Sequence, residues 1–453
     1  MDCKNTNKNN MLLHKLLVVS GLVLSAFLVA PLHANNLLEV YEHAKTNDVQ
    51  LKISEAGFLV ALEARPQIIS NLKPQVTLNA QTNYGLNYSG RTQFRDDGSA
   101  FFNLGYDLNL TKSLVNKQLD AQIEQVDASI LQSKANLESD RQDLIIRVAE
   151  AYFDYLNAKE NLVFRLSEIK AIEKQLNQAK IFFEAGRSAI TDVKEAQASF
   201  DLAKAQVSVA NQEIDVANES LRAITNRYYK SLEGASDNIP LVIPSPNNVE
   251  SWAKVAVANS KDVLAAKYGV DVAKSNVNIQ RAARKPTVNI VANQGHTSTF
   301  GDDSVDSDFT DASIGLSLSM PILDGGSISS SVRESRIQLQ QARQQLELQK
   351  RLATQQSRAA YFTVVSGMAQ VNALKQALNS SQAASKATQD GFEAGTRTAT
   401  DVLVSLRETF AARRDHSSAR YAFLLNTLRL KEAVGTLSET DLAAVSKLLN
   451  KKS

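Results

Sequence analysis

The chain contains two copies of one structural unit. The tetrapeptide Phe-Glu-Ala-Gly at residues 183–186 returns at residues 392–395. Thr-Asp-Val at residues 191–193 returns at residues 400–402, at the same offset. A repeat of roughly 200 residues is too long for a solenoid and indicates a duplicated half of a protein. Each half should therefore contain the same order of helices and strands.

The composition favours long helices over several compact cores. Among 453 residues there are only 18 Gly and 8 Pro, and aromatic residues make up 6%. Such a balance is typical of extended helices that pack through small and medium side chains. The formal net charge of +2 and the absence of a basic stripe with interleaved aromatics give no reason to expect a nucleic-acid partner.

The N-terminus predicts an export signal over residues 1–34. Lys4, Lys8 and Lys15 precede an apolar run from Leu16 to Ala30. A run of about 15 residues is short for a membrane anchor, and a small residue, Ala34, ends the segment as at a cleavage site. The only cysteine, Cys3, precedes the run, so we expect a mature chain without disulfides or lipidation.

Four segments alternate with a period of two, which predicts strands at 76–84, 102–110, 288–299 and 312–320. One face of each strand is apolar, and the other carries mainly small, hydroxyl or amide side chains. Half-buried strands of a soluble sheet would alternate similarly, but strands of this length and polarity match an outer-membrane barrel. No later run approaches 18 apolar residues, so we expect no transmembrane helix in the mature chain.

Four strands cannot close a barrel, and an open sheet edge is not tolerated in lipid. A membrane-inserted sheet would therefore need strands from several copies. Two copies would give a barrel filled by side chains, whereas three would leave a lumen. The polar loops at 89–100 and 301–308 are expected to be solvated. The second loop is acidic but lacks the glycine and final glutamate of a calcium loop, so no metal site is predicted.

Each half also contains a very long helix with apolar positions at alternating steps of four and three, the spacing of a coiled-coil seam. In the first half the seam is Leu119, Ile123, Val126, Ile130, Ser133, Leu137, Asp140 and Leu144. In the second half it is Ile328, Val332, Ser335, Leu339, Ala342, Leu346, Gln349 and Ala353. With no proline between strand and tip, about 60 to 70 helical residues reach on the order of 100 Å.

These patterns predict a fixed order of segments. A first repeat at 35–235 contains a helix from Leu37 to Ser70, a hairpin at 74–112, the long helix, a tip at 183–193 and a return helix from Ile190 to Tyr229. A linker follows at 236–250. The second repeat at 251–436 contains a helix from Trp252 to Arg284, a hairpin at 286–321, a tip at 392–402 and a return helix from Thr398 to Gly435. The tail at 437–453 should pack near the middle of the helices.

Several motifs resemble the TolC family of outer-membrane channel tunnels. The second tip, residues 395–403, reads Gly-Thr-Arg-Thr-Ala-Thr-Asp-Val-Leu, and the first tip carries Ala-Ile-Thr-Asp-Val at 189–193. Ala419-Arg420-Tyr421 and the segment 433–437 are similar to the family as well. The resemblance covers essentially the whole mature chain and implies an α+β membrane protein. Its trimer would combine a 12-stranded barrel, four strands per chain, with an α-helical coiled-coil tunnel.

The same resemblance implies a location and partners. The protein would lie in the outer membrane of a Gram-negative bacterium, in contact with lipid, with its helices in the periplasm. A periplasmic adaptor and an inner-membrane pump or ABC transporter would open it at its periplasmic tip. It would serve drug efflux, type I secretion or both, which the sequence does not distinguish. No cofactor is implied.

The tips carry the expected site residues. Gly186 and Gly395 end their long helices, where glycine can take the left-handed conformation. Thr or Asp at the start of each return helix can cap free N–H groups, which is the simplest role for Asp192 and Asp401. One difference between the two copies concerns charge, because Arg397 of the second tip corresponds to Ser188 of the first.

The resemblance assigns further roles to these residues. Arg397 would bond to Asp192 of a neighbouring helix pair and hold the entrance shut, although Phe392 stands where the family has a tyrosine. Asp401 would form a carboxylate ring in the constriction, and Val404 replaces a second aspartate of the family. The expected adaptor-docking turns are Ala185, Gly186, Arg187, Ala394, Gly395 and Thr396.

The sequence also bears on two other classes of protein. An enzyme is not expected, because the chain has no phosphate-binding Walker motif, no G-x-S-x-G and no H-E-x-x-H. A non-channel coiled-coil protein, such as a periplasmic adaptor or a surface scaffold, would share the long helices. Adaptors, however, pair one helical hairpin with glycine-rich barrel modules, which are missing from this sequence.

Overall fold

The structure is a computed structural model that describes residues 35–88, 98–235, 239–301 and 307–449. The predicted export signal at 1–34, including Cys3, lies outside these ranges. So do most of the two strand-connecting loops, three residues of the linker and the end of the tail.

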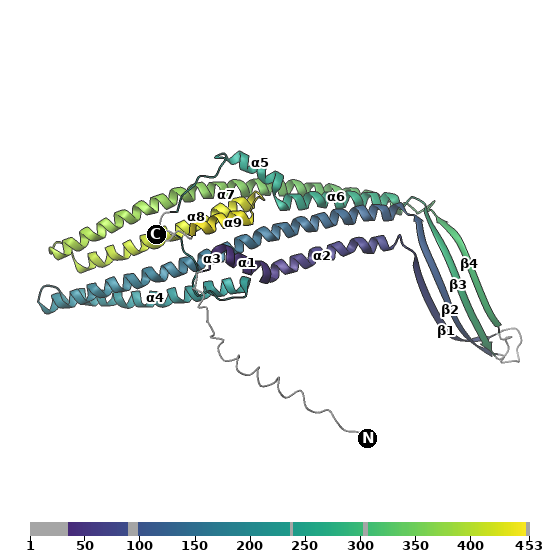
Figure 1. Ribbon diagram of the computed structural model, residues 1–453, viewed down its shortest axis with the longest axis horizontal. Helices are drawn as coiled ribbons and strands as arrows, with labels where there is room; N and C mark the ends of the chain where they lie inside the picture. The colour runs from purple at the N-terminus through teal and green to yellow at the C-terminus, as the bar shows by residue number, and fades with distance from the viewer. Residues whose placement is uncertain (1–34, 89–97, 236–238, 302–306, 450–453) are drawn as a thin grey trace, which may run out of the picture.

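Both halves of the chain have the same order of elements (Figure 1). The first half runs through α1 (Leu37–Asn47), α2 (Val49–Ser70), β1 (Gln75–Tyr88), β2 (Gly98–Val115), α3 (Lys117–Glu184) and α4 (Ile190–Thr225). The second runs through α5 (Val249–Asn259), α6 (Lys261–Ala282), β3 (Thr287–Gly301), β4 (Ser307–Ser319), α7 (Ser327–Glu393) and α8 (Ala399–Ala433). Helix α9 (Glu439–Leu449) follows. The duplication of short motifs thus reflects duplication of the fold.

The prediction of one continuous helix before each hairpin was wrong. The first is broken at Asp48, which has an extended ψ of 123° and whose carboxylate accepts a hydrogen bond from the Leu51 N–H at 2.7 Å. Asp48 therefore caps the start of α2. The second is broken at Ser260, which separates α5 from α6. The return helices also end earlier than predicted, because Asn226 and Gly435 adopt left-handed conformations just beyond them.

The four strands form one antiparallel sheet in the order β1-β2-β3-β4, so β2 and β3 join the two halves. Leu78 lies opposite Leu108, and Phe102 lies between Tyr84 and Phe300. The register therefore places most apolar side chains on one face, as the alternation predicted. Leu78 is 66% exposed and Ile314 is 80% exposed, which shows that no described helix covers that face.

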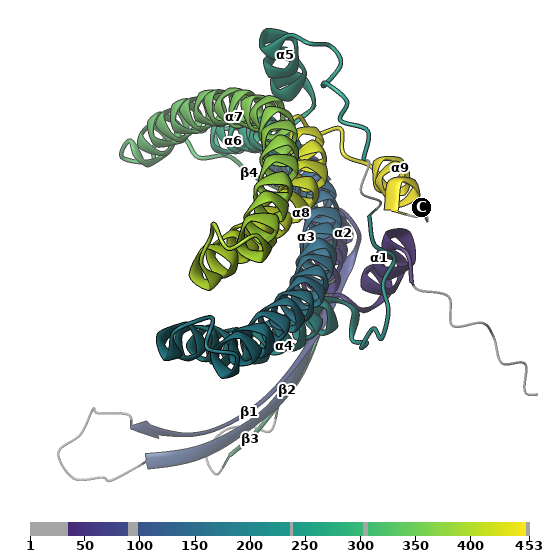
Figure 2. The same cartoon turned by 90° about the vertical axis from the view of Figure 1, so that its left-hand side faces the viewer.

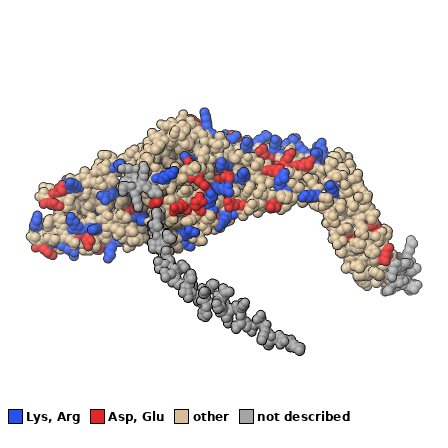
Figure 3. Space-filling model, viewed as in Figure 1, with Lys and Arg blue, Asp and Glu red and all other residues tan. Residues whose placement is uncertain are grey.

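The sheet is nearly free of charge. Its described strands carry only Asp107, Lys112, Asp308 and Asp311, whereas charged side chains are dense over the helices (Figure 3). An uncovered apolar face of this size marks contact with a membrane or with another protein. No helix within the described ranges combines the length and apolar composition needed to cross a membrane.

The long helices form a curved layer. Helices α7, α8, α3 and α4 follow one another along an arc when the molecule is viewed from the tips (Figure 2). With 68 residues in α3 and 67 in α7, each spans on the order of 100 Å. Every position of the two predicted seams is half-buried or buried.

Alanines at heptad spacing form additional buried lines that the sequence analysis did not single out. In α3 and α4 they are Ala121, Ala128, Ala135, Ala149, Ala196, Ala203, Ala210 and Ala217. Small side chains let neighbouring helices approach closely, since the distance between helix axes depends on the residues at the contact.

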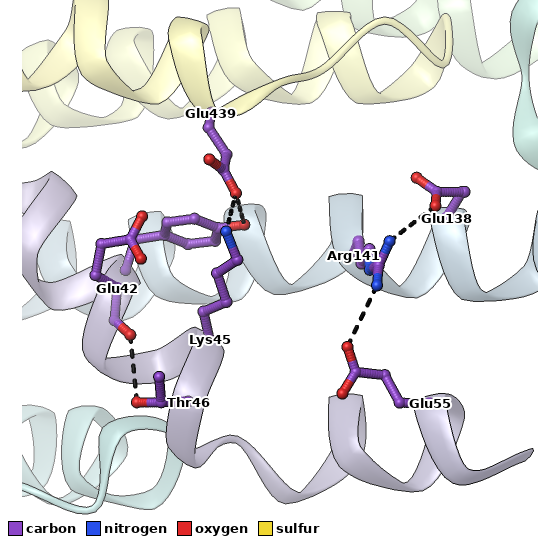
Figure 4. A network of polar contacts seen from close by, with 8 residues as sticks. Glu42, Lys45, Thr46, Glu55, Glu138, Arg141 and Glu439 are labelled. Carbon is purple, nitrogen blue, oxygen red and sulfur yellow. Dashed lines mark hydrogen bonds and ion pairs between the residues drawn. The ribbon is translucent and has the colours of Figure 1, made fainter. Parts of the chain in front are cut away.

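The main core lies midway along the helices. It joins α1, α3, α9 and the far ends of α4 and α8 through fully buried side chains, including Leu37, Tyr152, Leu221, Leu428 and Leu442. Polar contacts hold the rim of this region (Figure 4). Lys45 of α1 pairs with Glu439 of α9 at 2.6 Å, and Arg141 of α3 pairs with both Glu138 and Glu55. The tail is thereby fastened to the middle of the molecule.

Glu432, near the end of α8, should make stability depend on pH. Burial and the charges of Asp143, Asp262 and Glu150, against the effect of Arg429, together raise its pKa to about 7. A carboxyl with a raised pKa destabilises the folded state progressively as pH rises from about 4.5 through 7. Glu432→Gln should therefore be more stable than the parent at pH 8, by about 1–2 kcal/mol after solvent screening. Denaturant unfolding at pH 5 and pH 8 measures the difference.

The exposed Glu334 of α7 supplies the control for this prediction. Glu334→Gln should leave the pH dependence unchanged. If Glu432→Gln shows the same fall in stability between pH 5 and pH 8 as the parent, another group is responsible.

Candidate gate at the helical tips

Each long helix ends in the glycine turn that the sequence predicted. Gly186 has a φ of 70° and Gly395 a φ of 78°, in the left-handed region that favours glycine. Beyond α3, the Arg187 N–H donates to the Phe182 carbonyl at 2.8 Å. Beyond α7, the Thr396 N–H donates to the Gly391 carbonyl at 2.8 Å. Both turns are Schellman motifs, which satisfy the last carbonyls of the helix and reverse the chain.

The two return helices start differently. Thr398 caps α8: its hydroxyl accepts from the Asp401 N–H at 3.2 Å, and the Asp401 carboxylate accepts from the Thr398 N–H at 2.9 Å. This capping box holds the pKa of Asp401 below its usual value, chiefly through the Thr398 N–H. Helix α4 begins after Ala189 and has no side-chain cap. Capping thus explains Asp401, whereas the same explanation for Asp192 was wrong.

Arg397 and Asp192 do not bond within one chain, as far as the described residues go. Arg397 is exposed, and its stem lies against α7. A Cβ added at Gly391 would come within 2.9 Å of the Arg397 Cγ, so the glycine makes room for that side chain. The second tip therefore presents the Arg397 guanidinium to its surroundings.

The predicted residue Phe392 does meet the first tip, through partners that the sequence analysis missed. Its ring lies 5.6 Å from the ring of Phe182, between centroids. The Gln175 amide donates to Gln389 at 2.8 Å, and the Thr400 hydroxyl donates to Glu195. An alignment of the two copies could have pointed to this contact, because the first tip has an additional ring, Phe182, where the second has Gly391.

The predicted docking residues Ala185, Gly186, Arg187, Ala394, Gly395 and Thr396 are all exposed. Arg187 lies over the Phe182 ring, with 4.5 Å between its guanidinium carbon and the ring centroid. Val404, the other predicted constriction residue, is 39% exposed, whereas its neighbours Val402 and Leu403 are buried. The tip surface is therefore accessible and includes one stacked cation.

Buried polar contacts fasten α8 to α3 farther from the tips. Glu168 of α3 pairs with Arg165 at 2.9 Å and with Arg414 of α8 at 3.2 Å. Glu160 accepts hydrogen bonds from Ser417, from Tyr421 and from Arg420. Burial, followed by the charge of Glu160, raises the pKa of Tyr421. These contacts join α8 to α3 between the main core and the tips, and leave the tips themselves to be held by other contacts.

The comparisons with known proteins agree with this architecture. The family model described as outer membrane efflux protein matches residues 40–227 and 252–436, one segment in each half. The outer membrane protein TolC of Vibrio cholerae is 32% identical over 416 residues, which are 91% of this chain and 93% of that protein. TolC of Escherichia coli K12 is 32% identical over 96% of this chain and 89% of its own length. The proteases secretion protein PrtF of Dickeya chrysanthemi is 24% identical, covering 90% of each chain.

Solved structures share the fold at lower identity. A structure of CusC superposes with a TM-score of 0.76 at 18% identity, covering 89% of this chain and 92% of that chain. The outer membrane protein VceC of Vibrio cholerae gives a TM-score of 0.71 at 18% identity, covering 88% and 96%. Since the family model matches both halves and the TolC relatives span nearly the whole chain, the chain belongs to the TolC family of outer membrane efflux proteins.

Proposed function

We propose that this protein lies in the outer membrane and is the exit duct for efflux and type I secretion. The observation that carries the proposal is an uncovered apolar sheet joined directly to helices on the order of 100 Å long. The relatives named TolC and the secretion protein PrtF support the same role. A soluble coiled-coil scaffold would leave the apolar face of the sheet exposed to water.

The proposed assembly is a trimer. In one chain β1 pairs only with β2 and β4 only with β3, so both edges of the sheet are open. Edges of this kind are not tolerated in lipid, and three copies would close a barrel of twelve strands with a lumen. Helices α7, α8, α3 and α4 of one chain lie along an arc (Figure 2). Three arcs would enclose a tunnel.

The proposed gate lies between copies. Arg397 is exposed and does not bond to Asp192 of its own chain, so its guanidinium is available to Asp192 of the neighbouring copy. Asp401 would contribute a ring of three carboxylates to the constriction, next to the apolar Val404. The exposed turns at 185–187 and 394–396 would receive a periplasmic adaptor, which works with an inner-membrane pump or ABC transporter.

Asp401→Asn is expected to reduce the preference of the channel for cations. Rings of carboxylates favour cations in a narrow pore, and the amide removes their charge. The Asn oxygen still accepts from the Thr398 N–H, so α8 should begin as before. The reversal potential in a salt gradient measures the preference. Asp201→Asn, on the exposed side of α4, is the control. Equal reversal potentials for both variants would show that the Asp401 carboxylate does not line the pore.

Cell fractionation tests the proposal as a whole. We expect the protein in the outer-membrane fraction, as an oligomer that resists detergent without heating and becomes a monomer on boiling. Chemical cross-linking should end at three copies. A monomer in the soluble periplasmic fraction would favour the scaffold alternative.

A further inference from the structure

The two tips of one chain touch through aromatic rings. Phe182 in the last turn of α3 and Phe392 in the last turn of α7 lie 5.6 Å apart, with 32° between the ring planes. Both are half-buried, although the turns that follow them are exposed. This distance and tilt fall in the range of favourable aromatic pairs.

Arg187 stacks on Phe182 from within the same turn. Its guanidinium carbon is 4.5 Å from the ring centroid, a cation–π distance. The backbone holds this arrangement, because the Arg187 N–H donates to the Phe182 carbonyl at 2.8 Å. Ring, cation and glycine therefore belong to one hydrogen-bonded turn.

The second tip has no matching unit of its own. Gly391 stands at the position of Phe182, and Thr396 stands at the position of Arg187. A Cβ at Gly391 would lie 3.2 Å from the Thr396 hydroxyl and 2.9 Å from the Arg397 Cγ. A ring there would displace Arg397. The first tip thus supplies ring and cation, while the second supplies Phe392 and presents Arg397 outward.

Two polar contacts cross the same gap, from Gln175 to Gln389 and from Thr400 to Glu195. Water can replace the exposed contact from Thr400 to Glu195 when the hairpins move apart, whereas Gln175 is 6% exposed. Separating the rings exposes apolar area instead. The aromatic contact, together with the buried Leu403 of α8 that shares a core cluster with Ile172 and Leu176 of α3, is therefore the apolar part of this junction that resists opening.

We infer that Phe182, Arg187 and Phe392 form an aromatic clamp that holds the two helical hairpins of each chain together while the entrance is closed. This inference rests on the proposed channel function and extends it. The bond proposed between Arg397 and Asp192 joins neighbouring copies, whereas the clamp acts within each copy. Widening the entrance by parting the hairpins requires Phe182 and Phe392 to separate.

Bilayer recordings of the purified oligomer test the clamp. Phe182→Ala should raise the occupancy of the higher-conductance state about 3- to 10-fold, the range expected for one aromatic pair. Adding Phe392→Ala should raise it little further, because the pair is already broken. Phe392→Tyr keeps the ring and should preserve the closed state. The control is Phe183→Ala, which removes a neighbouring ring that is 42% exposed and outside the contact.

A second measurement does not depend on conduction. The predicted mature chain has no cysteine, so Ala185→Cys and Ala394→Cys allow spin labels on the two turns of one chain. Labelled copies diluted into unlabelled ones should give a narrow distance distribution that broadens with Phe182→Ala and not with Phe183→Ala. Identical distributions for the two variants would overturn the clamp. Absence of conductance in the parent would instead overturn the channel function, and the spin-label result would still decide the clamp.

Discussion

Arg397→Ser should raise the conductance of the closed channel about tenfold or more, because it removes the proposed bond to Asp192 of the neighbouring copy. A charge-assisted hydrogen bond contributes about 1.5–3 kcal/mol when shielded from water and less when exposed to it, and three symmetric copies of the bond would act together in the proposed trimer. The substitution also makes the second tip resemble the first, where Ser188 occupies this position. Single-channel recording at low voltage measures the effect.

The control for this prediction removes another exposed cation from the tip region, through Lys194→Ser. It should leave the conductance unchanged. Asp192→Asn should reproduce the effect of Arg397→Ser, and the double variant should add little to either. If Arg397→Ser has the same low conductance as the parent, the bond between Arg397 and Asp192 does not hold the entrance closed.

Asp48→Ala should lower the free energy of unfolding by about 2–4 kcal/mol, less than for a fully buried ion pair because Arg147 is 25% exposed, but including the loss of a helix cap. Asp48 is 3% exposed and bonds to both terminal nitrogens of Arg147, at 2.9 and 3.1 Å. Its carboxylate also caps α2 at the Leu51 N–H. Removing it leaves Arg147 with Asp143 alone and leaves the start of α2 uncapped. Denaturant unfolding followed by circular dichroism measures the loss.

Asp127→Ala is the matched control. Asp127 pairs with Arg65 at 2.7 Å, but both side chains are nearly half exposed, so its loss should cost about 0–1 kcal/mol. Burial alone would raise the pKa of Asp48, but Arg147 and the Leu51 N–H lower it overall. Its stabilisation should therefore be present above about pH 4 and disappear as pH falls through the folded pKa. Equal losses of unfolding free energy for Asp48→Ala and Asp127→Ala would show that burial does not strengthen the pair of Asp48 and Arg147.

Much of the fold could be predicted because its signals are local. Alternation over about ten residues identifies each strand, and the scarcity of proline allows helices of nearly 70 residues. The repeat then supplies each half with the elements found in the other. The breaks at Asp48 and Ser260 were missed because each is a single residue with helical sequence before and after it.

The candidate site was only partly predictable. Gly186 and Gly395 are required by the turn itself, and the sequence identified them correctly. Phe392 was singled out for its missing hydroxyl, but its contact with Phe182 depends on the packing of two hairpins. Gln175 and Gln389, which cross the same gap, are separated by 214 positions. No local pattern specifies pairs so far apart in the chain.

A bilayer recording of the purified oligomer tests most directly whether this chain forms a gated channel. We expect discrete conductance steps that favour cations and that grow when Arg397 is replaced by serine. A folded, helical and trimeric protein that produces no conductance step, with or without Arg397, would contradict the claim that this chain forms a gated channel.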